Sequence, residues 1–319
     1  MKSGLGDTLN RNKPLKRPIH SRTGRIQIAA MNENVRIITD SGCDLSPQTE
    51  KELEGILIIM PFAVTINGKS YIDRIDIQPD EFYKILKEND EIPKHSQITA
   101  IQFEDKFREL YEQGVREIIV DVINAAGSQT FAAAQLAAQN TADLDGLNVH
   151  VIDGRNYTLA YGYPVAEACR KLSEGQSVES VCAYLEDWAR HSEAYIIGFG
   201  LRHMKKSGRI SAAASFLGEL MGLKPLISLY DEKTQVLTKA RGNKAVIEAA
   251  VETISSKMIP ETPWSIITTT NPDLEKEFIE RMTKRVGYGP TMVEKCGVVV
   301  SCNAGPDFIG VIIRGQDRG

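Results

Sequence analysis

The feature that most limits the fold of this sequence is the alternation of short β-branched runs with longer helical segments in its first two thirds. VRIIT (35–39) and REIIVDV (116–122) have the composition of buried strands, whereas FEDKFRELYEQG (103–114) repeats its large apolar side chains at helical spacing. Strands that alternate with helices in this way predict βαβ units and a mainly parallel sheet.

Ligands of parallel sheets bind at the loops that follow the carboxyl ends of the strands. Here these are the loops at 39–46 and 123–130. The loop KHSQIT at 94–99 stands ahead of a helix and is expected to join them.

The pattern changes near residue 190. A strand AYIIGFG is followed by a basic loop (201–211), a small-residue helix (212–222), a β-hairpin, helices over 244–258 and 273–286, and a final strand pair near 292–313. The prediction is therefore an α/β fold of two domains: residues 35–190 around a mainly parallel sheet, and residues 191–319 with a mixed α/β arrangement. Residues 1–34 carry a net charge of +5 without the apolar core of a signal peptide, and are expected to be a disordered basic extension.

The composition excludes several classes of protein. Of the 319 residues, 42% are hydrophobic and 25% charged, as in soluble globular proteins, and the net charge of -4 with 7% aromatics argues against nucleic-acid binding. No apolar run approaches the roughly 20 residues of a membrane span. The five cysteines include no CxxC pair, which argues against a zinc site or a disulfide framework and favours the cytoplasm. No P-loop, GxGxxG after a strand, or HExxH occurs, so neither a nucleotide cofactor nor a metal is expected.

Hydroxyl side chains at loop–helix junctions are the best candidates for a binding site. Ser128 and Thr130 stand where a helix is expected to begin, and free backbone N–H groups there favour an anion. The alternative is that Ser128 only caps its helix. Ser96, Gln97 and Thr99 allow the same two interpretations, and the loop that they share with His95 is either an ordinary turn or one wall of a site for a negatively charged group.

Cations in the second half point to the same kind of ligand. KKSGRI (205–210) contains Lys206 and Arg209, and Arg241 stands in KARGNK. Arginine presents a planar fork that suits a carboxylate or phosphate. The alternative is an ordinary solvated basic loop.

Several of these segments together resemble the DegV family. They occur in the family's order and spacing between residue 35 and about residue 314: TDSGCDLS, KHSQIT, AGSQTFAAA, LRHMKKSGRIS, LGELMGLKPLISL, TKARGNKA and AGPDFIG. The resemblance implies two α/β domains, with a long-chain fatty acid buried in the first and its carboxyl group near the interface. It also implies a carrier without enzymatic activity of its own, which presents the acyl chain to a separate ATP-dependent kinase that would form an acyl phosphate.

The resemblance also assigns residues. The family's loop reads Thr-Ser-Gln-Pro, so Ser96 and Gln97 match while His95 replaces a threonine that binds the carboxylate. Ser128 and Thr130 keep the family's Ser-Gly-Thr helix start, with Gln129 in place of the glycine.

Two further positions carry over. Arg209 matches the family's arginine, which implies docking of the kinase or steadying of phosphate. Asn303 replaces a histidine that helps to hold the carboxyl group. Our hypothesis is that His95 takes over the role of that imidazole from the opposite wall. The alternatives are a hydrolase or transferase that acts on a small carboxylate or phosphate with His95 as base, and a carrier of another small anion or amphiphile.

Overall fold

The computed structural model describes residues 34–89, 91–208, 211, 222–230 and 233–316. The predicted small-residue helix at 212–222 lies almost wholly outside the described residues, as do Arg209 and the basic extension except for Asn34. None of the helices among the described residues is both long and apolar enough to cross a membrane.

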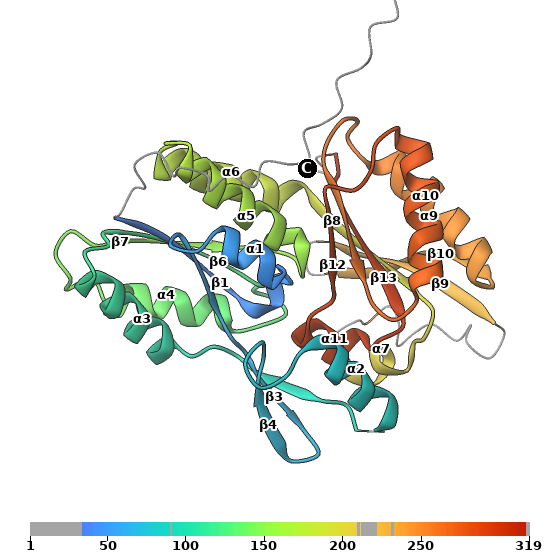
Figure 1. Cartoon of the computed structure of the whole chain (residues 1–319), viewed down its shortest axis with the longest axis horizontal. Helices are drawn as coiled ribbons and strands as arrows, with labels where there is room; N and C mark the ends of the chain where they lie inside the picture. The colour runs from blue at the N-terminus through green and yellow to red at the C-terminus, as the bar shows by residue number, and fades with distance from the viewer. Residues whose placement is uncertain (1–33, 90, 209–210, 212–221, 231–232, 317–319) are drawn as a thin grey trace, which may run out of the picture.

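A four-stranded parallel sheet forms the first part of the fold, as predicted. Its strand order is β2-β1-β6-β7, and every neighbouring pair is parallel. Helices α3 and α4 cover one face, and α5 and α6 the other (Figure 1). The bounds are β1 Val35–Asp40, α1 Pro47–Glu52, β2 Leu57–Met60, α3 Ala100–Glu112, β6 Glu117–Val122, α4 Thr130–Asn140, β7 Asn148–Asp153, α5 Leu159–Ser173 and α6 Val178–His191.

A small antiparallel sheet projects below the parallel one (Figure 1). A hairpin forms from β3 (Ala63–Ile66) and β4 (Lys69–Ile72), and Asn67 and Gly68 both have positive φ at its turn. After helix α2 (Pro79–Glu88), the chain returns as β5 (Lys94–Ser96), which pairs with β3. The sequence predicts a loop here, and that prediction is wrong because β3 offers a free edge to these polar residues.

The second part is a mixed six-stranded sheet of order β10-β9-β8-β13-β11-β12, in which only β11 and β12 are parallel among the pairs described. Helices α9 and α10 pack on the face away from the parallel sheet (Figure 1). The bounds are β8 Ser192–Gly198, α7 Arg202–Ser207, β9 Leu223–Tyr230, β10 Lys233–Arg241, α9 Asn243–Lys257, β11 Trp264–Thr268, α10 Pro272–Val286, β12 Met292–Lys295, α11 Val298–Ala304 and β13 Phe308–Arg314.

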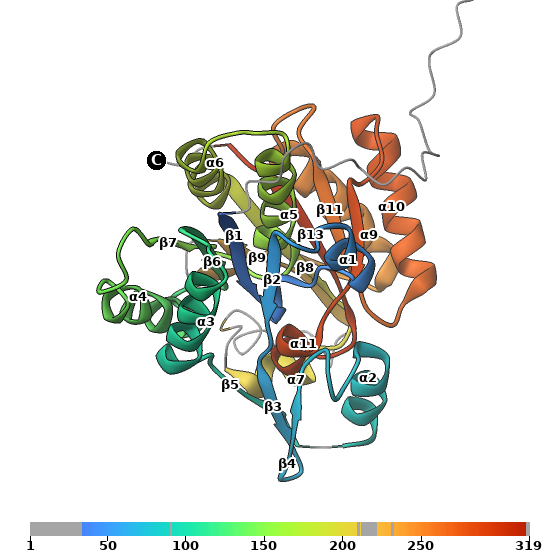
Figure 2. The ribbon, with the colours of Figure 1, turned by 60° about the vertical axis from the view of Figure 1, so that its left-hand side comes forward.

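Two predictions for this part are wrong. Residues 202–207 form helix α7 rather than a basic loop, since His203 and Met204 are buried and α7 contacts α11. The last two strands do not pair with each other, because β11 lies between them and helix α11 joins them. Figure 2 shows α7 and α11 side by side near β5.

Helix α5 lies between the two large sheets. It contacts β1 and β6 on one side and β8, β11 and β13 on the other, and 11 of its 15 residues are buried. At Gly162 the approach is so close that a Cβ atom would lie 2.1 Å from the carbonyl oxygen of Cys43. One core cluster thus runs from Val35 to Ile312 across both parts. The domain boundary near residue 190 stays a prediction.

The interior of α5 contains Pro164, which has no N–H to donate to the carbonyl four residues earlier. That carbonyl belongs to Ala160, and the indole N–H of Trp188 in α6 donates to its oxygen at 2.9 Å. Trp188 therefore supplies the donor that the proline removes, and fixes α6 on α5.

We expect Trp188→Phe to lower the free energy of unfolding by about 1–3 kcal/mol for the buried acceptor left without a donor, in addition to lost packing. In a Pro164→Ala background the helix regains its own N–H donor, so the same change should cost less. Urea unfolding of the four proteins measures the difference. Equal costs in the two backgrounds would contradict this account.

Candidate functional site

A polar hollow of about 160 Å³ lies at the carboxyl end of the parallel sheet. Strand β5 and the loop after β6 line it with His95, Gln97, Ala126, Gly127, Ser128 and Gln129. Helix α4 begins behind this loop. Its N-cap residue, Gln129, makes no side-chain cap hydrogen bond, and its first turn carries no acidic residue. Backbone N–H groups and the helix dipole therefore favour an anion in this hollow.

Ser128 and Thr130 form a pair at the start of α4. Their hydroxyl oxygens lie 2.9 Å apart, and the Thr130 N–H donates to the Ser128 oxygen at 3.3 Å. Thr130 is fully buried, whereas Ser128 is half-buried and lines the hollow. Ser128 thus satisfies a backbone N–H of the first turn while it also faces the hollow, so the two interpretations of this residue are compatible.

A second, apolar cavity of about 50 Å³ adjoins the hollow. His95 and Gly127 line both spaces, and Tyr157 and Asn303 line the cavity. The rest of its lining is aliphatic: Ile123, Ile196, Leu229, Val299, Val300 and Ala304. The sequence places an acyl-chain pocket within residues 35–190, and this cavity also draws on β8, β9 and α11.

His95 and Asn303 meet where the two spaces adjoin. The Asn303 Nδ2 atom lies 3.3 Å from the His95 Nε2 atom, although the residues are 208 positions apart. Either the amide donates to an unprotonated Nε2, or the amide is turned and its oxygen accepts from Nε2–H. The Phe62 ring packs edge-on against the imidazole with ring centres 5.7 Å apart. The His95–Asn303 pair therefore presents polar atoms at one end of the apolar cavity.

The loop that carries Ile123 is held by a buried carboxylate. Asp40 accepts hydrogen bonds from the Ile123 N–H at 2.7 Å, the Gly42 N–H at 2.9 Å and the Tyr161 hydroxyl at 2.6 Å. Next to it, the Ser41 hydroxyl oxygen accepts a hydrogen bond from the Phe62 N–H at 3.1 Å. These bonds give Asp40 and Ser41 structural partners. No cluster of metal-binding side chains occurs in the described part of the chain.

Comparison with known proteins identifies the family. The profile of the DegV family, described as a family of uncharacterised proteins, matches residues 34–315. The chain belongs to the DegV family. A DegV domain-containing protein of Caldanaerobacter subterraneus is 27% identical over 284 residues, which cover 88% of this chain and 99% of that one.

Solved DegV structures share the fold. A DegV family protein from Thermus thermophilus, described by its fatty acid binding, superposes with a TM-score of 0.78 at 26% identity, covering 89% of this chain and all of that one. A stearic acid-binding protein from Eubacterium ventriosum has a TM-score of 0.76 at 23% identity and covers 88% of this chain and 98% of that one, which shows the common fold. The predicted two-part α/β architecture is thereby confirmed.

The structure brings together some of the residues that the DegV resemblance assigns. His95, Gln97 and Ser128 line the hollow, Asn303 lines the cavity, and Thr130 lies buried behind Ser128. Ser96 is exposed and alternates to the face of β5 opposite His95. Lys206 and Arg241 are exposed on α7 and at the end of β10, and Arg209 lies outside the described residues.

Tyr157 was not predicted. It lines the cavity, and its hydroxyl lies so close to Gly127 that a Cβ atom there would be 2.6 Å from the oxygen. Tyr157 follows the carboxyl end of β7, a parallel strand, so the rule that pointed to the loop after β6 applies equally to the loop after β7.

The buried carboxyls predict an unusual pH dependence. Burial raises the pKa of Asp40 to about 6 despite its three hydrogen bonds, and burial likewise raises the pKa of Asp73, which follows β4, to about 6. In the unfolded chain both ionise near 3.8. Between about pH 4 and pH 6 the folded protein therefore binds more protons than the unfolded one, and stability falls as the pH rises.

Urea unfolding across this range measures the slope. We expect Asp40→Asn to flatten it, whatever that protein's absolute stability. A stability that falls from pH 4 to pH 6 as steeply in the variant as in the wild type would contradict the assignment, as would a wild-type stability that rises over this range.

Proposed function

We propose that this protein binds a long-chain fatty acid, with the carboxylate in the polar hollow and the alkyl chain directed through the apolar cavity. The observation that carries the proposal is that the two spaces adjoin at His95 and Gly127. An anion-favouring helix start thus faces the head group while aliphatic side chains face the tail. The fatty acid binding of the Thermus thermophilus relative supports the same ligand class.

His95 is the proposed head-group donor that distinguishes this chain. It contacts Asn303 at the boundary of the two spaces, and the resemblance implies a different side chain at each of these two positions. An imidazole can donate to a carboxylate in its neutral or its charged form. Ser128 would donate its hydroxyl from the opposite side of the hollow, with Gln97 at the rim and Ser96 acting through its backbone.

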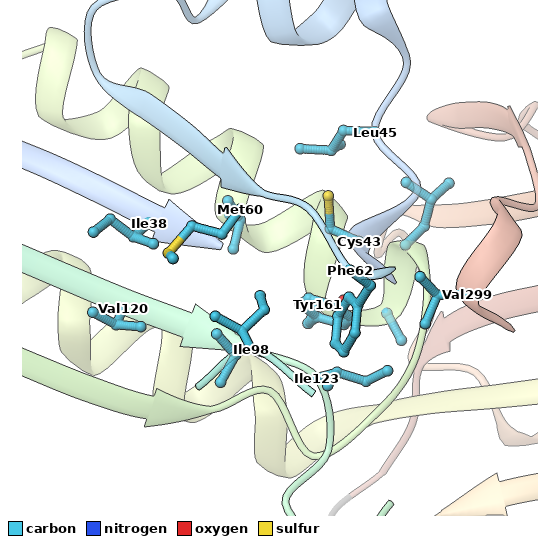
Figure 3. Close-up of a cluster of buried hydrophobic side chains, with 14 of the residues drawn as sticks. Ile38, Cys43, Leu45, Met60, Phe62, Ile98, Val120, Ile123, Tyr161 and Val299 are labelled. Carbon is cyan, nitrogen blue, oxygen red and sulfur yellow. The ribbon is translucent and has the colours of Figure 1, made fainter. Parts of the chain in front are cut away.

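The apolar cavity has room for only a small group, so a long alkyl chain requires its walls to part. Ile123 and Val299 line it and also belong to the larger core cluster. Figure 3 shows the apolar side chains of this cluster continuing from these two residues to Phe62, Ile98 and Met60. We expect the alkyl chain to enter between these side chains, which places its tail in the first part of the fold.

A carrier of this kind needs a partner to use the carboxylate. The sequence has no P-loop, so the proposal includes a separate ATP-dependent kinase that forms the acyl phosphate. Helix α7, which carries Lys206, contacts α11, which carries Asn303, so this exposed cation lies one helix away from the head-group site. Arg209 and Arg241 are the further residues proposed for the kinase or the phosphate.

The contacts of His95 suit a binding role. Its imidazole meets the Asn303 amide and the Phe62 ring, and neither of these groups activates a nucleophile. We propose a carrier rather than the alternative, a hydrolase or transferase with His95 as base. All five cysteines are unpaired, which supports a reducing compartment such as the cytoplasm.

Replacing His95 by alanine should weaken palmitate binding by about 10–100-fold, since a hydrogen bond to a charged group contributes roughly 1.5–3 kcal/mol. Isothermal titration with delipidated protein measures the change. His150→Ala is the matched control, because this imidazole lies on β7, 3.1 Å from Glu117, and lines neither space. A His95→Ala affinity within about twofold of the wild type would rule out the head-group role.

A series of fatty acids tests the apolar half of the site. From octanoate through dodecanoate to palmitate, each additional CH₂ should strengthen binding by about 0.8 kcal/mol, roughly fourfold, until the chain fills the pocket. Affinity that is independent of chain length would instead favour a site for a small anion. Mass spectrometry of an organic extract then identifies the chain that the protein carries after expression.

A further inference from the structure

A third hollow, of about 300 Å³, lies apart from the fatty-acid site and shares no lining residue with it. It is formed where the loop after β1, the segment after β4 and the end of β12 come together. Six charged side chains line it: Asp44, Glu50, Asp73, Arg74, Glu294 and Lys295.

The two cations of this hollow are engaged by other groups. Arg74 donates to Glu50 at 2.6 Å and to the Leu45 carbonyl oxygen at 2.9 Å. Lys295 contacts Asp80 at 2.5 Å, outside the lining. Neither Asp44 nor Asp73 forms an ion pair among the described residues, although the positive charge of Arg74 lowers the pKa of both.

Asp44 is the residue that points to a ligand. Its side chain lines the hollow and the residue is 4% exposed, yet neither carboxyl oxygen has a hydrogen-bond partner in the described part of the protein. Burial raises the pKa of Asp44 well above its ordinary value, although the Gly297 backbone, the charge of Arg74 and the Cys296 thiol act in the opposite direction. A buried carboxyl without partners is costly and calls for a donor.

Asp73, next to Asp44, is likewise a buried carboxyl with an oxygen that accepts no hydrogen bond among the described residues. It is 2% exposed, its Oδ2 atom has no hydrogen-bond partner within the described residues, and the negative charge of Asp73 contributes to the raised pKa of Asp44. Two neighbouring carboxyls thus face one hollow with acceptor atoms unused.

The position of the Asp44 carboxyl requires a glycine at residue 297. At Gly297 a Cβ atom would lie 2.4 Å from the Asp44 Oδ1 atom, so any other residue would collide with the carboxyl. Gly297 is also the N-cap residue of α11. The position of the carboxyl is therefore built into the packing of α11 rather than left to a flexible surface side chain.

The carboxyl groups that line the hollow determine which class of ligand can bind there. Ionised carboxylates only accept hydrogen bonds, so the ligand must bring N–H or O–H donors and positive charge. No set of three acidic, histidine or cysteine side chains suited to a metal ion occurs among the described residues. An organic cation with several N–H donors satisfies these conditions, and the volume admits a small one.

We propose that the hollow at Asp44 and Asp73 binds a small organic ammonium ion, whose N–H groups donate to the two carboxylates. The ammonium keeps its protons. A carboxyl that is protonated in the empty hollow breaks its O–H bond, releases that proton to solvent and accepts the N–H of the ligand.

Isothermal titration of the full-length protein with n-butylammonium chloride tests the proposal, against sodium chloride at equal ionic strength. We expect saturable binding at millimolar concentrations, weakened at least about tenfold by Asp44→Asn and by Asp73→Asn. Asp143→Asn is the control of equal charge change, because its carboxylate is 65% exposed and pairs with Arg108 elsewhere. Circular dichroism establishes that each variant is folded, and either Asn variant suffices if the other is not.

The outcomes separate this site from the fatty-acid site. His95→Ala should bind butylammonium as the wild type does, so failure of either proposal leaves the other intact. No saturable binding, or binding unchanged in a folded Asp44→Asn or Asp73→Asn protein, would overturn the ammonium site. Displacement of butylammonium by micromolar Mg²⁺ or Ca²⁺ would overturn the ligand class in favour of a metal ion.

Discussion

The burial of helix α5 between two sheets is the constraint on which the rest of this structure depends. A helix packed on both sides must be apolar nearly all round, and it must present small residues where backbones approach, as Gly162 does against Cys43. It also cannot leave a carbonyl unpaired, which is why the indole of Trp188 compensates for Pro164. Because one core cluster spans both parts, the two sheets are held in a fixed relation across the cavity between them.

The same helix sets the geometry of the proposed fatty-acid site. Tyr157, which lines the cavity, stands two residues before α5 begins. The Tyr161 hydroxyl, from the first turn of α5, donates to Asp40, and Asp40 in turn accepts from the Ile123 N–H. The cavity wall on the side of the parallel sheet is therefore tied to α5 through one buried carboxylate. Such a carboxylate costs stability at neutral pH, and its retention is explained by the loop that it positions.

The sequence was sufficient to predict the secondary structure where the local pattern of apolar residues agrees with the tertiary packing. The β-branched runs of the parallel sheet were predicted correctly because β1 and β6 are buried almost throughout, and α3 because its large apolar side chains recur at helical spacing. The errors occur where packing overrides local preference. Lys94–Ser96 has no strand composition and becomes a strand only at the edge of β3. Val298–Ala304 has a β-branched start but becomes the helix that joins β12 to β13, and five of its seven residues are buried.

The sequence pointed to several residues that line the two spaces, but not to their contacts. The resemblance singled out His95 and Asn303, and the sequence alone could not bring together two positions that are 208 residues apart. In the fold, β5 pairs with β3 while α11 contacts β5, so the two side chains face each other where the polar hollow meets the apolar cavity. This contact is compatible with the hypothesis that His95 takes over the role of an imidazole that the resemblance implies at position 303. The Asn303 amide can turn to complement either tautomer of the His95 ring, so the two side chains can remain paired in both.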